Sequence, residues 1–186
     1  MANNASNVAA GKPKVGGAVY RAPAGTAVPT DATTALSNAF ICLGYCSEEG
    51  MTQSVKRESN KVKAWGGDTV MTVQTSFDET FKIKLIEVLN VDVKKAAFGD
   101  DNVTGTLATG ITTKVNSKEL PEAVWVVETV QNSAVCRQVI PCGKVSELAD
   151  ITYTDGNPIG YDIKISALPD ATGQASYEYT KAVETE

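Results

Sequence analysis

The sequence contains no histidine among its 186 residues. Histidine is the commonest general base and metal ligand, and it completes the Ser-His-Asp and Cys-His arrangements of nucleophilic enzymes. An enzyme would therefore have to work through carboxylates, and the acidic pairs are Glu48-Glu49 and Asp100-Asp101. Adjacent residues do not face each other, and both pairs stand in polar surroundings, which favours solvated turns over an acid and base pair or a calcium site. We expect a protein that is not an enzyme and that uses no cofactor and no metal.

Long apolar runs and an excess of basic residues are also missing. No uncharged apolar stretch reaches the ~18 residues of a membrane helix, and the start, MANNASNVAAGKPKVGG, lacks the apolar centre of a signal peptide. The chain has 17 Lys and Arg against 22 Asp and Glu, a net charge of −5, so its surface should repel nucleic acid. We expect a soluble protein made in the cytosol, with no membrane partner.

The four cysteines, Cys42, Cys46, Cys136 and Cys142, show no CxxC spacing. If Cys42 and Cys46 lie on one strand, they are ~13 Å apart and cannot share a zinc ion. We expect reduced, buried thiols rather than a metal site or a disulfide.

The length fits one domain with a polar arm before it. Residues 1–30 are rich in Ala, Asn, Gly and Pro and cannot build a core by themselves, so we expect an extended N-terminal arm. Residues 31–186 form the expected single domain, with a C-terminal strand or arm from about residue 169.

Two short helices are expected. Thr30 or Asp31 can cap the first, whose apolar residues fall at helical spacing: Ala32, Leu36, Ala39 and Phe40. Asn90 caps the second, VDVKKAAF, which carries Asp92 in its first turn and ends at Gly99.

The remaining pattern is that of antiparallel strands. Apolar and polar residues alternate in 69–77, 80–88 and 159–167, which predicts half-buried strands, and 122–130 reads as a buried strand. Their inward apolar residues would be Met71, Val73, Phe77, Phe81, Ile83, Leu85, Tyr161, Ile163 and Ile165. Further strands are expected at AVCRQVIP, GKVSELADITYTD and ASYEYTKAV, the last with Tyr177 and Tyr179 on one face. Asp155-Gly156 is the strongest hairpin turn signal in the chain.

The stretch KVKAWGGDTV, residues 61–70, contains one of the two tryptophans and a glycine pair. Neither G-x-G-x-x-G nor a P-loop follows, and the stretch leads into a strand, so a phosphate site is not indicated. Gly66 and Gly67 allow positive φ, which favours a chain reversal. Trp65 fits equally a core position and an interface anchor. The nearby basic cluster of Lys56, Arg57 and Lys61 is interrupted by Glu58, which favours an exposed, interacting loop over nucleic-acid binding.

The order of these segments resembles the major tail tube proteins of long-tailed, non-contractile bacteriophages. The resemblance rests on the LGY–EEG opening and on the VKRES–KAWGGDTV–LIEVLN series, followed by the short helix VDVKKAAFG and by strands that end in a DG turn. It spans roughly residues 11–168.

The resemblance implies a mainly β fold: an antiparallel β-sandwich or flattened barrel with one or two flanking helices. Six copies would form a ring whose inner sheets join into one barrel, and stacked rings would form the tube through which DNA leaves the virion. The implied partners are other copies of the chain and other tail proteins, such as tape measure, terminator and distal tail proteins. Assembly would take place in the host cytoplasm, and DNA would pass through the lumen without specific binding.

In such proteins a long loop between the second and third strands reaches a neighbouring subunit, and here it maps to about residues 50–68. The candidate interface residues are Lys56, Arg57, Glu58, Lys61, Lys63, Trp65, Gly66, Gly67 and Asp68. The polar faces of the strands would line the lumen, and we expect them to be net negative because a basic wall would hold DNA through its phosphates.

A second hypothesis is a monomeric β-sandwich that binds a receptor or a carbohydrate at a virion or cell surface. Such a module would need a concave patch of exposed aromatic residues. Aromatic residues make up only 6% of the chain and are scattered.

Overall fold

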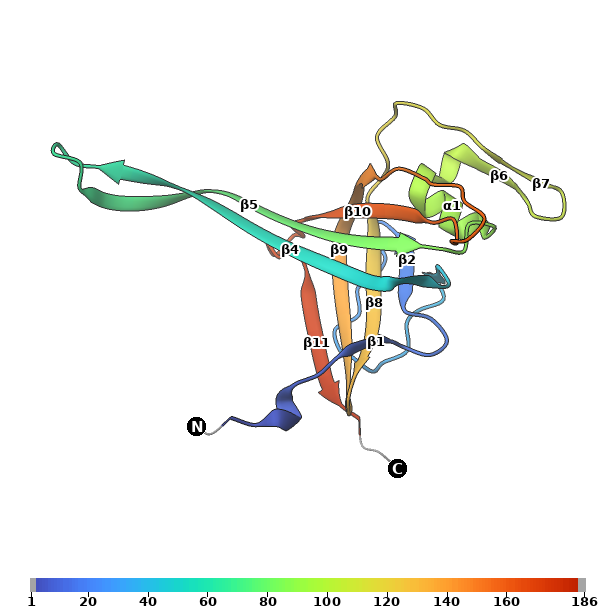
Figure 1. Ribbon diagram of the computed structural model, residues 1–186, viewed down its shortest axis with the longest axis horizontal. Helices are drawn as coiled ribbons and strands as arrows, with labels where there is room; N and C mark the ends of the chain where they lie inside the picture. The colour runs from blue at the N-terminus through green and yellow to red at the C-terminus, as the bar shows by residue number, and fades with distance from the viewer. Residues whose placement is uncertain (1–2, 184–186) are drawn as a thin grey trace.

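The computed structural model describes residues 3–183, and most of its strands belong to one antiparallel sheet (Figure 1). The sheet order is β3-β2-β8-β9-β10-β5-β4, with β1 added to β8 and β11 added to β9. The strands of this sheet are β1 (Gly11–Pro13), β2 (Val19–Pro23), β3 (Ile41–Cys42), β4 (Cys46–Lys63), β5 (Thr69–Leu85), β8 (Ala123–Gln131), β9 (Ala134–Leu148), β10 (Tyr161–Leu168) and β11 (Tyr177–Ala182). The predicted mainly β, antiparallel fold is confirmed, without a closed barrel.

Smaller elements flank one end of the sheet. They are the helix α1 (Val91–Phe98), the short 3-10 helix η2 (Asp100–Asn102) and a two-stranded sheet of β6 (Val103–Thr106) and β7 (Gly110–Thr113). Another 3-10 turn, η1 (Ala5–Asn7), precedes β1. In Figure 1, β4, β5 and β10 run across the molecule, whereas β8, β9 and β11 run nearly at right angles to them.

The centre of the sheet is buried on both faces. Trp125 of β8 belongs to the larger core, which also contains Phe81, Ile163 and Val93 of α1. Val124 and Val126, whose side chains alternate with that of Trp125, belong to a second cluster with Phe40. The near-continuous apolar run of β8 follows from this double burial.

The expected faces of β5 and β10 are confirmed over their paired segments. Tyr161 pairs with Leu85, Ile163 with Ile83 and Ile165 with Phe81, and all six side chains are buried. The alternating residues of β10, Asp162, Lys164 and Ser166, lie on the opposite face, as expected.

Strand β9 is continuous where the sequence predicts two strands on either side of Pro141. Proline has no N–H to donate, which normally ends a central strand. Here Pro141 lies at a register shift against β8 and between the segments of β9 that pair with β11 and with β10. The missing donor therefore falls where the ladder is already interrupted.

Only one of the two predicted helices exists within residues 3–183. Helix α1 is confirmed with its Asn90 cap, whose side chain accepts a hydrogen bond from Asp92 N at 3.0 Å, and with Gly99 at its C-cap. The predicted helix over residues 31–40 is wrong. Asp31 does accept hydrogen bonds from the backbone of Thr33 and Thr34, but Arg137 donates to the carbonyls of Asp31 and Thr34. Those carbonyls would otherwise accept the bonds of the next helical turn.

Part of the predicted arm lies inside the sheet. Strand β2 pairs with β8, and its residues Val19 and Ala22 are 0% and 1% exposed. Strand β2 was not predicted, because five residues between glycine-rich stretches give too short a pattern. The segment before it is held at the sheet edge by β1, which pairs with the end of β8.

The other local differences concern a turn and a strand. Residues 149–160 separate β9 from β10, so the predicted tight hairpin at Asp155-Gly156 is wrong, although the two strands pair. Cys42 ends β3 and Cys46 begins β4, so these residues do not share one strand. All four cysteines are free, and burial raises the pKa of the Cys46 thiol to about 11.

Candidate subunit interface

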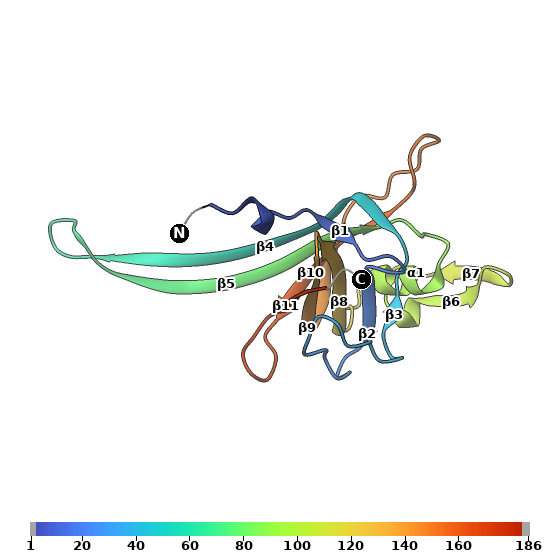
Figure 2. The same cartoon turned by 90° about the horizontal axis from the view of Figure 1, so that it is seen from below.

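Strands β4 and β5 form a long antiparallel hairpin that projects far from the rest of the molecule (Figures 1 and 2). The root of β5 is anchored in the core, where Phe81, Ile83 and Leu85 are buried. Strand β10 pairs with β5 only as far as Glu79, and the residues of the hairpin beyond that point pair with each other alone. Nearly all side chains between residues 55 and 78 are exposed.

The predicted loop at residues 50–68 is therefore a strand followed by a short turn. The register runs from Met51 opposite Ile83 to Lys63 opposite Thr69. The predicted half-burial of residues 69–77 is wrong in the single chain, since Met71, Val73 and Phe77 are 53%, 44% and 42% exposed. The alternation of apolar and polar residues is real, but one copy of the chain supplies no core for these side chains to pack against.

The tip of the hairpin is a compact turn. Ala64 N donates to Asp68 O at 2.8 Å, and Gly67 N donates to Ala64 O at 3.0 Å. Gly66 and Gly67 have φ of 107° and 100°, which is strained for any residue with a side chain. Trp65, which stands between Ala64 and Gly66, is fully exposed. A core position, one of the two roles left open for this residue, is therefore excluded.

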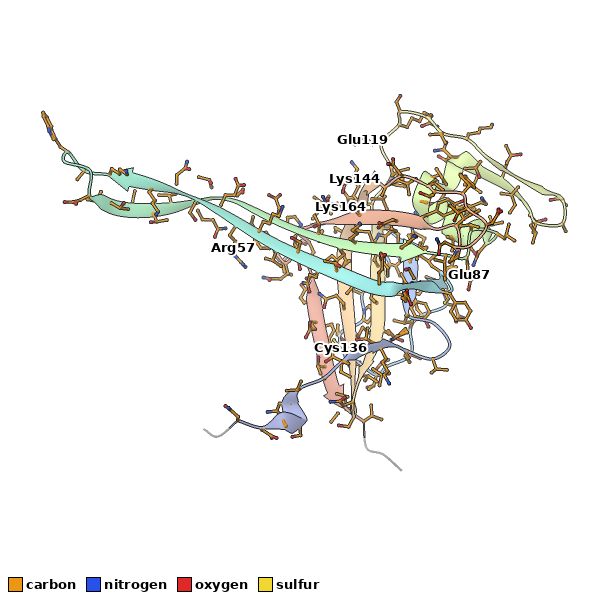
Figure 3. All side chains as sticks on the ribbon, in the orientation of Figure 1. Arg57, Glu87, Glu119, Cys136, Lys144 and Lys164 are labelled. Atoms are coloured by element: carbon orange, nitrogen blue, oxygen red, sulfur yellow. The ribbon has the colours of Figure 1, made fainter. Side chains whose placement is uncertain are left out.

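The structure brings all nine predicted interface residues onto the outer part of the hairpin, and all of them are exposed. Arg57 lies on the projecting part (Figure 3), where its guanidinium carbon is 4.9 Å from the centre of the Phe77 ring. This cation–π contact keeps the aromatic ring and a positive charge together on the surface. Within residues 3–183, Lys56, Arg57, Lys61 and Lys63 form no ion pair within 4.0 Å.

Sequence reasoning missed that apolar residues belong to the same surface. The exposed apolar side chains of the hairpin are Val55, Val62, Val70, Met71, Val73 and Phe77. The signal was present for Met71, Val73 and Phe77, because their alternation with polar residues predicted a strand with one apolar face. This apolar face was expected to pack on the core of the same chain.

A buried carboxylate lies at the root of the hairpin. Glu79 is 6% exposed, and its Oε1 accepts hydrogen bonds from Gln53 Nε2 at 2.6 Å and from Ser176 Oγ at 2.9 Å. Both donors are neutral. Glu79 pairs with Val55 on β4 and with Ala167 on β10, so it marks the point at which the hairpin leaves the body.

The other buried charges are paired within the chain. Arg137 contacts Glu128 through two nitrogens, and Lys14 binds the second oxygen of Glu128 at 2.6 Å. Arg137 also holds the carbonyls of residues 31 and 34, so this cluster fixes the segment that covers the second core cluster. The role of this cluster in the fold accounts for its buried charges, and no ligand is needed to explain them.

The polar face of β4, β5, β9 and β10 is not net negative, so the expected charge of these faces is wrong. Cross-strand pairs place five lysines and four acidic residues there: Lys56, Lys82, Lys84, Lys144 and Lys164 with Glu58, Asp78, Glu147 and Asp162. Several are matched locally, as Lys82 and Asp162 are at 2.8 Å and Lys164 and Glu147 at 3.5 Å. Lys144 and Lys164 are labelled in Figure 3 with Glu119, which binds Lys144 at 2.7 Å. The face is polar and close to charge balance.

The two acidic pairs lie in separate elements of the structure. Glu48 and Glu49 stand at the irregular start of β4, whereas Asp100 lies in η2 and binds Arg21 through both oxygens. This contact lowers the pKa of Asp100. Between residues 3 and 183 no cluster of three Cys, Asp or Glu side chains suits a metal ion. No described helix has the length and apolarity needed to span a bilayer.

The fold and the site define a mainly β protein with a projecting hairpin that exposes apolar and basic side chains. A model of the family "Phage tail tube protein" matches residues 1–183, so the chain belongs to this family. It is a structural protein of the phage tail, as the resemblance implied. No curated protein matches the chain.

Proposed function

We propose that the chain assembles with copies of itself into hexameric rings, and that stacked rings form the tail tube through which DNA leaves the virion. The observation that carries this proposal is the β4–β5 hairpin. It exposes Trp65, Phe77 and five aliphatic or thioether side chains, all of which lie outside the core of the same chain. An exposed apolar surface of this kind on a projecting element is typical of an interface.

Strand β4 provides a second reason for self-association. It is 18 residues long and forms the end of the sheet, so its outer edge carries unpaired backbone groups. Proteins protect such edges, and pairing with a neighbouring strand is the direct way to do so. Edge pairing from copy to copy is a head-to-tail contact, which closes into a ring when the rotation between copies fits.

In the proposed ring the polar face of β4, β5, β9 and β10 lines the lumen. Its near balance of charge suits a conduit, because DNA phosphates meet neither a strongly attractive nor a strongly repulsive wall. The tube would be assembled in the host cytoplasm and would contact tape measure, terminator and distal tail proteins at its ends and in its lumen. None of these roles calls for a cofactor.

The test is sedimentation and negative-stain electron microscopy of the purified chain at rising concentration, beside a variant in which residues 56–77 are replaced by a two-residue turn. We expect rings or tubes from the natural chain and folded monomers from the shortened one, since the core strands lie outside the deleted part. A natural chain that stays monomeric at every concentration would reject the proposal. The same result would favour the monomeric binding module, although its exposed aromatic residues come from three separate parts of the chain: Tyr45 before β4, Trp65 and Phe77 on the hairpin, and Tyr153 between β9 and β10.

A further inference from the structure

We propose that Glu79 is the acceptor for a cation from a second copy of this chain, namely Lys61 or Lys63 at the tip of the neighbour's hairpin. This inference rests on the proposed self-assembly and names a contact within it. The contact would join the tip of one hairpin to the root of the next.

The first argument is the unusual state of the Glu79 carboxylate. A buried charge is costly unless a counter-charge or several strong hydrogen bonds compensate it. Glu128 and Arg137, the other buried charges in the described residues, have partners of opposite charge, whereas Glu79 has only Gln53 and Ser176. Both of these donors bind Oε1, and no residue within 3–183 donates to Oε2.

The free oxygen of Glu79 is not fully enclosed. Within the described residues, Ser76 Oγ is the one side-chain nitrogen or oxygen atom that is fully enclosed and has no hydrogen-bond partner. Glu79 Oε2 has no partner either, so it is not fully enclosed and retains contact with solvent. The side chain lies between Val55, its partner on β4, and Phe77, two residues along β5 on the same face. These neighbours are 45% and 42% exposed. A carboxylate flanked by Val55 and Phe77 matches a lysine, whose aliphatic stem packs on apolar side chains while its ammonium group binds the oxygen.

The second argument is charge complementarity. Residues 55–78 carry four basic side chains, Lys56, Arg57, Lys61 and Lys63, against three acidic ones, Glu58, Asp68 and Asp78, which is a net +1. Since the whole chain has −5, the remainder has −5 − 1 = −6. The projecting element is thus positive and the body negative, which favours contact between the hairpin of one copy and the body of another.

The intrachain alternative is Arg57, which lies on the same face of the hairpin as Glu79. Its guanidinium stacks on Phe77 and forms no ion pair within 4.0 Å of Glu79. Lys61 and Lys63 belong to the part of the hairpin that projects farthest from their own Glu79, because they pair with Thr72 and Thr69 near the turn. They can therefore serve a neighbour's carboxylate and not their own.

The experiment compares Glu79→Gln with the natural chain and with Glu122→Gln, a control that removes one exposed negative charge elsewhere. Glu79→Gln keeps the acceptor oxygen for Gln53 and Ser176. We expect its monomer to melt at the same or a higher temperature, because a buried charge is removed, while the concentration needed for half assembly rises about tenfold or more. Glu122→Gln should assemble like the natural chain. If Glu79→Gln assembles normally, or if its monomer melts at a lower temperature, the inference is wrong.

A charge exchange tests the identity of the partner. Glu79→Lys brings lysines together at each contact, and Lys61→Glu with Lys63→Glu brings carboxylates together, so each variant should fail to assemble alone. Mixed in equal amounts they should form rings, because each tip then meets a root of opposite charge. If Arg57→Gln reproduces the defect of Glu79→Gln while Lys61→Gln with Lys63→Gln assembles normally, the cation is intrachain and the inference fails.

These outcomes separate the inference from the proposed function. Normal assembly of Glu79→Gln, with loss of assembly on shortening the hairpin, would leave the tube proposal intact and remove only the role of Glu79. A natural chain that never assembles would remove both.

Discussion

At the scale of single residues, the two tryptophans show what the neighbours in sequence can and cannot predict about burial. Trp125 is 1% exposed and donates from Nε1 to Gly143 O at 3.2 Å, whereas Trp65 is fully exposed. The neighbours in sequence distinguish them: Trp125 stands in a continuous apolar run, and Trp65 stands before a glycine pair in a charged stretch. The pattern predicted the bend at Trp65 and the buried strand at Trp125, but not the exposure of Trp65, because exposure depends on whether another copy is present.

Trp65→Ala should separate folding from assembly. Because the side chain touches no core residue, we expect the free energy of unfolding of the monomer to change by less than about 0.5 kcal/mol. A tryptophan that anchors an interface costs more than ~2 kcal/mol on truncation, so assembly should weaken strongly. Thermal melting of the monomer and sedimentation of the assembled form give the two readings, with Trp65→Phe as a milder control. Unchanged assembly of Trp65→Ala would show that the tip is not part of the interface.

Arg137→Met should lower the stability of the monomer, because Arg137 holds the fold together rather than an interface. The change leaves Glu128 buried with only the half-exposed Lys14 as a counter-charge and removes the bonds to the carbonyls of Asp31 and Thr34. We expect a loss of about 3 kcal/mol or more in the free energy of unfolding, measured by urea denaturation. Lys14→Met should cost no more than about 1 kcal/mol, because the Lys14 side chain is 43% exposed. Equal losses for the two variants would contradict this account of the cluster.

At the scale of elements, the sequence predicted those whose signals are local. Helix α1 has its cap, its charge pattern and its terminal glycine within ten residues, and the alternation in β10 is set by a single buried face. The failures involve distant partners. Arg137, more than 100 residues away, takes the carbonyls of the expected helix at 31–40, and the bulge against β8 allows Pro141 inside β9. Local pattern does not contain either contact.

The hairpin depends both on local signals and on contacts that local sequence does not contain. Its strands and its turn at Gly66-Gly67 follow from local sequence, but its length was read as a loop because residues 54–63 are mostly polar and charged. In a strand with both faces outside the core of its own chain, polar residues are no obstacle to pairing. The charged residues chosen as interface candidates were brought together, whereas Glu79 was not considered, since burial of a single carboxylate leaves no mark in sequence.

Hydrogen exchange should divide the hairpin at Glu79. In the monomer, residues 56–77 belong to a two-stranded ribbon without a core, so their amides should exchange quickly. Residues 80–85 of β5 lie between β4 and β10 over the core and should exchange slowly. On assembly, the outer segment should gain protection and the root should change little. Equal protection of the two segments in the monomer would mean that the ribbon is stable without a neighbour.

At the scale of the whole molecule, charge is distributed unevenly, and this distribution links assembly with passage of DNA. The outer hairpin, residues 55–78, has a net +1 against −6 for the rest of the chain, while the polar face of β4, β5, β9 and β10 has five lysines and four acidic residues. The net charge of −5 does not describe this face, because it averages over surfaces that the fold keeps apart. In the proposed tube, contacts between copies use the opposite charges of hairpin and body, and the lumen uses local pairing of lysines with carboxylates.

The last prediction removes that local pairing. Glu147→Gln with Asp162→Asn would leave five lysines and two acidic residues on the face, so its net charge would rise from +1 to +3 in each copy. Because each copy contributes the same face to the ring, the wall would become strongly basic and would bind DNA through phosphate contacts that weaken steeply with salt. Tubes of the variant should retain linear duplex DNA in cosedimentation at low salt and release it as salt rises, whereas natural tubes should retain little at any salt. The control, Glu122→Gln with Glu178→Gln, removes the same number of charges from residues that lie off this face. Retention of DNA by both variants alike would mean that another surface lines the lumen, since only the position of the charges distinguishes them.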